Sequence, residues 1–115
     1  MKRQSLVFIL IVLLALSTTN QAITSSDWGP VDINDPHVVD IAKFAVTAYN
    51  KRNTVGKLAF EKVISGESQN VINGTNFRLT LSARQIITVQ KYRAIVLEKP
   101  LVHFRNLVSF ELINA

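Results

Sequence analysis

The hydrophobic period of this chain changes once, near Gly56, from a helical repeat to a strand repeat. Asp35 and Pro36 form a strong helix start, because the carboxylate can cap free N–H groups and proline suits the first helical position. Apolar residues then recur at three- and four-residue spacing, at Val38, Ile41, Ala42, Ala45, Ala48 and Tyr49. We therefore predict one helix of about 17 residues that ends near Asn53.

β-Branched and aromatic residues dominate the chain after Gly56. The predicted strands cover residues 58–72 with a bend at Ser65-Gly66, then 77–82, 92–97 and 104–113, the last with Phe104, Val108, Phe110 and Leu112 on one face. Asn73-Gly74 predicts a hairpin with a type I′ turn. Residues 75–99 contain no Gly or Pro, so their turn is expected at Ala83-Arg84-Gln85 or, alternatively, at Gln90-Lys91.

These elements predict an α+β fold in one domain, with the helix packed across a four- to five-stranded antiparallel sheet. A helix of that length spans roughly 25 Å, enough to cross four or five strands spaced about 4.8 Å apart. We expect four aromatic residues in the core: Phe44, Tyr49, Phe77 and Phe104.

The start of the chain is typical of a targeting segment. Lys2 and Arg3 precede an uninterrupted apolar run of 11 residues, 6–16, and a membrane span needs about 20. We predict a signal peptide over residues 1–22, cleaved after Ala22, and a mature domain over 23–115. A signal anchor is the alternative. The mature protein is expected in the secretory pathway, extracellular or vacuolar, without a membrane partner.

Composition excludes several classes of function. The absence of cysteine excludes a disulfide scaffold, a thiolate metal site and a thiol nucleophile. No paired carboxylates suggest acid–base catalysis, so we expect no enzyme, no metal and no cofactor. Without Lys2 and Arg3 the net charge is about +3 and scattered, which does not favour nucleic-acid binding. We expect His37 and His103 at the surface, although His103 could contact a partner.

The order of motifs resembles the plant cystatins. Residues 41–51, Ile-Ala-Lys-Phe-Ala-Val-Thr-Ala-Tyr-Asn-Lys, resemble the helix signature of that family. Residues 60–67, 74–79, 92–96, 99–100 and 104–110 resemble its strands. The resemblance covers about residues 28–111, and the lack of cysteine suits the plant branch. It implies a cystatin-like fold.

The resemblance also implies an activity. Cystatins are reversible, non-covalent inhibitors of papain-like (C1) cysteine proteases, whose active-site cleft they fill with a wedge. The wedge combines an N-terminal segment, a first hairpin loop and a second loop that carries Pro-Trp. Carried onto this chain, the protease-binding residues are Asp27, Trp28, Gly29, Asn70, Val71, Ile72, Asn73, Gly74, Pro100 and Leu101.

All three wedge elements depart from the family pattern. Ser26-Asp27 stands where the family has Gly-Gly, Asn70 replaces Gln and Ile72 replaces Val. Leu101 replaces Trp and so loses much of a large contact and the indole N–H donor. We therefore expect inhibition that is weakened, with roughly a tenfold loss of affinity from Leu101 alone.

Asn73-Gly74-Thr75 is also an acceptor sequon for N-linked glycosylation. A glycan on Asn73 would obstruct entry into a narrow cleft; alternatively, Asn73 is unmodified and suits the turn. The rival functions are a non-inhibitory cystatin-fold binding protein of the secretory pathway and a basic protein that adheres to acidic wall polysaccharide. We expect a monomer.

Overall fold

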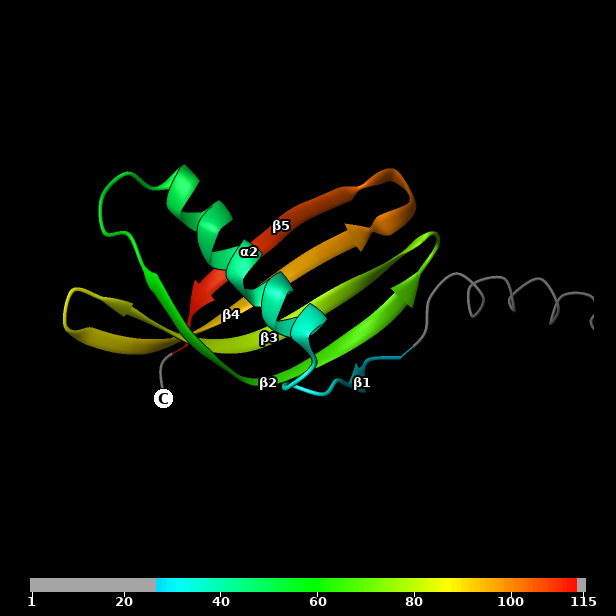
Figure 1. Cartoon of the computed structure of the whole chain (residues 1–115), viewed down its shortest axis with the longest axis horizontal. Helices are drawn as coiled ribbons and strands as arrows, with labels where there is room; N and C mark the ends of the chain where they lie inside the picture. The colour runs from blue at the N-terminus through cyan, green and yellow to red at the C-terminus, as the bar shows by residue number, and fades with distance from the viewer. Residues whose placement is uncertain (1–26, 114–115) are drawn as a thin grey trace, which may run out of the picture.

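The computed structural model describes residues 27–113, which form one helix packed against one antiparallel sheet (Figure 1). The five strands are ordered β1-β2-β3-β4-β5, so each strand pairs with its sequence neighbour. The elements are β1 (Gly29–Pro30), α2 (Pro36–Arg52), β2 (Ala59–Val71), β3 (Gly74–Gln85), β4 (Thr88–Lys99), the 3₁₀ turn η1 (Pro100–Val102) and β5 (Phe104–Leu112). The predicted α+β architecture is confirmed.

The predicted signal peptide, residues 1–22, lies outside the described residues. Within residues 27–113, no helix has the length and hydropathy that a membrane crossing requires.

Helix α2 begins and ends where its sequence predicts. The side chain of Asp35 accepts a hydrogen bond from the backbone N–H of His37 at 2.9 Å, and Pro36 occupies the first turn. At the other end, the backbone N–H of Asn53 donates to the carbonyl of Tyr49 at 3.0 Å. Both ends therefore satisfy backbone groups that a helix leaves without partners.

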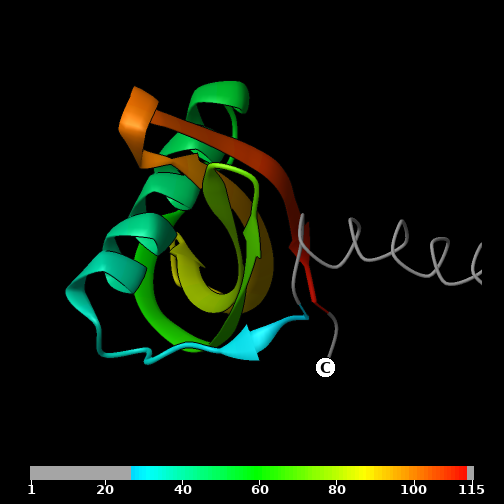
Figure 2. The ribbon, with the colours of Figure 1, turned by 90° about the vertical axis from the view of Figure 1, so that its right-hand side faces the viewer.

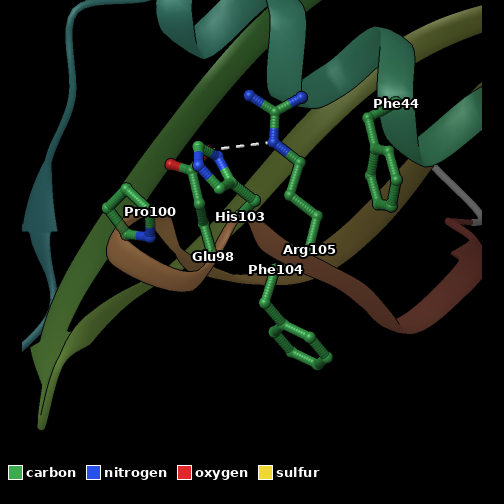
Figure 3. A pocket seen from close by; sticks show the side chains of 6 residues that line it. All are labelled: Phe44, Glu98, Pro100, His103, Phe104 and Arg105. Carbon is green, nitrogen blue, oxygen red and sulfur yellow. Dashed lines mark hydrogen bonds and ion pairs between the residues drawn. The ribbon is translucent and has the colours of Figure 1, made fainter.

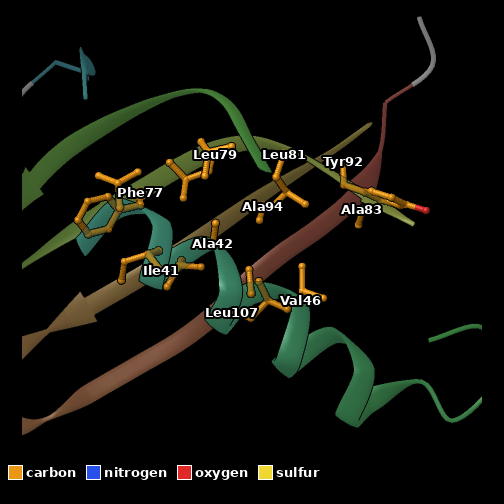
Figure 4. Close-up of a cluster of buried hydrophobic side chains, with 14 of the residues drawn as sticks. Ile41, Ala42, Val46, Phe77, Leu79, Leu81, Ala83, Tyr92, Ala94 and Leu107 are labelled. Atoms are coloured by element: carbon orange, nitrogen blue, oxygen red, sulfur yellow. The ribbon is translucent and has the colours of Figure 1, made fainter. Parts of the chain in front are cut away.

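The core lies between α2 and the sheet, which curves around the helix (Figures 2 and 4). The helix contributes Val38, Ile41, Ala42, Ala45 and Val46 to the core; the strands contribute Val63, Phe77, Leu79, Leu81, Ala83, Tyr92, Ala94, Val96 and Leu107. Small alanines on the buried face of α2 let the helix approach the sheet closely.

The predicted face of the last strand is wrong, because β5 contains a β-bulge. Leu107 and Ser109 pair with the consecutive residues 96 and 95 of β4, so Val108 is an extra residue between them. The bulge changes which side chains point inward: Leu107 is buried, while Phe104 is 43% exposed and is not a core residue. The other three aromatic residues expected in the core are buried or packed against it.

Both predicted hairpin turns need correction. The β2–β3 turn is centred on Ile72 and Asn73, with Val71 paired to Gly74. Only Asn73 of the two has a positive φ, 61°, a pattern of type II rather than type I′ turns. Asn tolerates this backbone conformation better than most residues, which explains why it occupies the position.

The β3–β4 turn lies at Ile86-Ile87, between Gln85 and Thr88, and neither predicted location is correct. Ile86 has a φ of 58°. No turn residue marks this position, because β-branched residues favour strands and rarely adopt a positive φ.

Candidate functional site

The segments predicted to form a wedge meet at one end of the molecule. The chain leading into β1, the β2–β3 turn and η1 all lie at the right-hand end of Figure 1, and Figure 2 views them end-on. The structure therefore brings together every residue that the sequence assigned to the site. We refer to residues 27–29, 70–74 and 100–102 together as the binding edge.

The N-terminal part of the binding edge is fixed to β2. Gly29 pairs with Ser68, and the backbone N–H of Val31 donates to the carbonyl of Gly66 at 3.1 Å. The ring of Trp28 lies 4.2 Å from the guanidinium carbon of Arg78, a cation–π contact. These contacts hold the segment close to the first loop, although it carries none of the glycines expected before Trp28.

The first loop exposes Ile72, which is 60% accessible, beside the exposed Asn73. Gly74 explains how this loop reaches the second one. A Cβ added to Gly74 would lie 2.5 Å from the carbonyl oxygen of Glu98 and 3.0 Å from Cγ of Lys99. The missing side chain therefore allows the first loop to pack directly against the strand end that leads to Pro100.

The second loop presents apolar side chains from one short turn. Leu101 is 87% exposed, and Val102 beside it is also exposed, a residue that sequence reasoning missed. His103 closes the turn with a φ of 51° and donates its backbone N–H to the carbonyl of Pro100 at 3.1 Å. His103 is exposed, as predicted for a surface residue.

Charged side chains lie beside the second loop, and Figure 3 shows two of them, Glu98 and Arg105. Glu98 is only 8% exposed. One of its carboxylate oxygens lies 2.6 Å from Nε2 of His37, within hydrogen-bond distance. The other accepts a hydrogen bond from Nε of Arg105 at 2.9 Å. Arg105 also contacts Asp40 of α2 at 2.9 Å. This cluster, His37, Asp40, Glu98 and Arg105, ties the start of α2 to the strands on both sides of the loop.

His37 is exposed, as predicted, but its contact with Glu98 was not expected. The side chain of His37 is half exposed, yet its ring faces both Glu98 and Phe77. The centroids of the His37 and Phe77 rings lie 5.9 Å apart. Burial alone would lower the pKa of Arg105, but the hydrogen bonds that Arg105 donates to Glu98 and Asp40 outweigh burial and raise that pKa. Arg105 therefore remains charged, and Glu98 has a permanent cationic partner.

The binding edge offers contact surface rather than reactive groups. Ile72, Leu101 and Val102 are exposed apolar side chains on turns that the sheet holds in place. Across residues 27–113, no group of three His, Cys, Asp or Glu residues is placed to hold a metal ion. Such an edge can enter a groove and bind by shape and apolar contact.

Comparisons with known sequences give consistent results. A family model described as "Aspartic acid proteinase inhibitor" matches residues 31–113. "Cysteine proteinase inhibitor 5" of Arabidopsis thaliana is 47% identical over 107 residues, which cover 91% of this chain and 86% of that protein. "Putative cysteine proteinase inhibitor 7" of Oryza sativa is 40% identical over 116 residues, which cover 99% of this chain and 98% of that protein.

Solved structures share the same arrangement of helix and sheet. The salivary cystatin of the soft tick Ornithodoros moubata superposes with a TM-score of 0.65 at 15% identity, covering 76% of this chain and 97% of that one. The squash aspartic acid proteinase inhibitor superposes with a TM-score of 0.59 at 28% identity, covering 77% of this chain and 93% of that one. The first likeness is one of fold, and the second extends to sequence.

Proposed function

Since this chain belongs to the plant cystatin family of proteinase inhibitors, we propose that it inhibits papain-like cysteine proteases by inserting the binding edge into their active-site cleft. The family consists of inhibitors, and the chain is not an enzyme. The inhibitor contributes no chemistry in this mechanism: it blocks the cleft and binds reversibly.

One observation carries the proposal: Ile72 and Leu101 are exposed on two loops that Gly74 allows to pack together at one end of the sheet. An apolar edge of this kind has little conformational freedom to lose when it binds, so more of the contact energy is available as affinity. A large exposed apolar surface is also typical of interaction sites.

The test is a titration of papain with the chain and with two variants. Each variant replaces an exposed apolar residue by aspartate, and the two substitutions lie at opposite ends of the molecule. L101D places a charge on the binding edge and should weaken inhibition at least tenfold. I87D places the same charge at the far hairpin and should leave the inhibition constant unchanged. If L101W and N70Q together fail to strengthen inhibition by a deglycosylated sample, the wedge mechanism is wrong for this chain.

We further propose that the protein enters the secretory pathway and that Asn73 carries an N-linked glycan. Asn73 is exposed at the tip of the β2–β3 turn, where a transferase can reach it, and Thr75 completes the sequon. In a secreting plant host we expect an N-terminus at Ile23 and a mass increase that N73Q removes. Removing the glycan enzymatically should strengthen papain inhibition, since a glycan there would block the cleft.

A second candidate function is inhibition of aspartic proteinases. The description of the matching family model and the 28% identity to the squash aspartic acid proteinase inhibitor favour it. Titrating pepsin alongside papain distinguishes the two candidates. Inhibition of papain alone supports the wedge, inhibition of pepsin alone supports the second candidate, and inhibition of neither supports a non-inhibitory binding protein. Size-exclusion chromatography of the same sample should show the monomer that we propose.

A further inference from the structure

The β3–β4 hairpin ends in two exposed isoleucines, at the end of the molecule opposite the binding edge (Figure 1, left). Ile86 is 85% and Ile87 is 87% exposed. The exposed Val89 follows them, paired in register with Arg84. Side chains this apolar and this accessible at the tip of a narrow ribbon are unusual for a surface turn, which normally carries polar residues or glycine.

The backbone at the tip makes the choice of residue more unusual. Ile86 has a φ of 58°, a conformation that is strained for a β-branched residue and that glycine or asparagine would adopt readily. Strain of this kind is often retained where the side chain itself has a role. The observation therefore indicates that an isoleucine at the tip is useful for something other than folding.

The hairpin behind the tip is basic. The chain contains no Asp or Glu between Glu67 and Glu98, while Arg84, Lys91 and Arg93 all lie in the outer half of the hairpin. Arg84 pairs with Glu61 of β2. Within residues 27–113, Lys91 and Arg93 make no ion pair, although Arg93 lies opposite Glu111 of β5 in the register.

The cations and one apolar residue share a face. Tyr92 and Ala94 of β4 are buried toward the helix, so Val89, Lys91 and Arg93 alternate onto the outer face of the sheet. An apolar tip with a basic flank is thus presented on one side of the hairpin.

We propose that the β3–β4 hairpin docks onto the surface of an anionic lipid bilayer, with Ile86 and Ile87 entering the interface and Lys91 and Arg93 binding lipid headgroups. Each basic residue near an anionic membrane strengthens binding, and apolar side chains gain by entering the boundary between headgroups and acyl chains. Docking of this kind needs no membrane-spanning segment, because the side chains enter only the interfacial layer of the bilayer.

A lipid surface fits the hairpin better than a protein partner does. Stable protein interfaces use about 20–30 residues a side, whereas this tip offers a few side chains on a two-stranded projection. A bilayer imposes no demand for a complementary shape, and its negative charge matches the basic flank. Docking by this end would leave the binding edge, at the opposite end, directed away from the membrane.

The absence of cysteine allows a site-specific test. A chain that starts at Ile23, which retains every element of the described fold, is prepared as I87C and as L101C, and each is labelled with a fluorophore that responds to polarity. With vesicles of phosphatidylserine and phosphatidylcholine, we expect the label at position 87 to shift to shorter wavelength and the label at 101 to remain in water. Vesicles of phosphatidylcholine alone should produce no shift.

The contribution of charge is tested with K91Q/R93Q in the I87C background, after circular dichroism shows that the variant is folded. Loss of two cations should lower partitioning into anionic vesicles roughly thirtyfold. Addition of 1 M salt should also weaken it, because the Debye length falls to about 3 Å. An unchanged label at 87, an equal shift at 101, or equal binding to neutral vesicles would overturn the proposal.

Discussion

Leu101 is the single residue from which we expect the largest change in inhibitory strength. Its side chain is 87% exposed on η1. Tryptophan at this position would add contact area and an N–H donor, so L101W should lower the inhibition constant for papain about tenfold. V89W adds the same side chain at the other end and should not alter it. An L101W variant no tighter than the parent would show that η1 stays outside the cleft.

Glu98 is the residue whose removal should disturb the second loop from beneath. E98Q keeps the shape of the side chain but removes the charge that Arg105 and His37 face, so we expect unfolding to become easier by about 1–3 kcal/mol. Papain inhibition should also weaken, because Glu98 lies two residues before Pro100. Denaturant unfolding and papain titration measure the two effects.

The matched control for Glu98 is Glu67, which is paired with Arg78 at 2.9 Å but is nearly half exposed. Because exposed ion pairs contribute little, E67Q should change stability by less than about 1 kcal/mol. Equal losses in E67Q and E98Q would mean that burial of the cluster has no special effect.

Single-residue properties show where sequence reasoning succeeds and where it stops. The residues of the binding edge, apart from Val102, were predicted from family resemblance, because the motifs occur in the same order along the chain. The contact of His37 with Glu98 joins residues 61 positions apart and depends on how α2 crosses the sheet. No local pattern encodes such a contact, so the sequence predicted the exposure of His37 but not its partner.

At the scale of elements, the β3–β4 turn allows the cost of Ile86 to be measured. Glycine adopts a φ of 58° without strain, although it adds entropy to the unfolded chain. The net effect of I86G should be a gain of about 1 kcal/mol in the free energy of unfolding, or several degrees in Tm. I87G relieves no positive φ and should be neutral or destabilising. A loss of stability in I86G would mean that the tip is not strained.

The position of an element was predicted correctly where its residues carry a strong sequence pattern, and wrongly where they do not. Helix α2 has an aspartate cap, a proline and a steady apolar period, and both of its ends were correct. The β3–β4 turn carries two β-branched residues in place of Gly, Asn or Asp, so its position was predicted wrongly. The β5 bulge left no mark in the sequence, and a shift of one residue is enough to reverse the faces of a strand.

At the scale of the whole molecule, the curved sheet separates two surfaces of different character. The binding edge gathers loops from one end, and the basic apolar hairpin projects from the other. The strands that join them carry the buried residues of the core, so neither surface contributes to folding through deep burial. We therefore expect a substitution at one end to leave the other end unchanged.

This separation predicts additivity between the two ends. In the double variant L101W/I86G, the gain in papain affinity should equal that of L101W alone, and the gain in stability should equal that of I86G alone. Each should agree within about 0.5 kcal/mol, because distant sites without shared partners rarely couple. Papain titration and denaturant unfolding of the parent, both single variants and the double variant complete the cycle. A coupling above about 1 kcal/mol would show that strain at the hairpin tip is transmitted along β3 and β4 to the binding edge, and the two ends would then have to be treated as one unit.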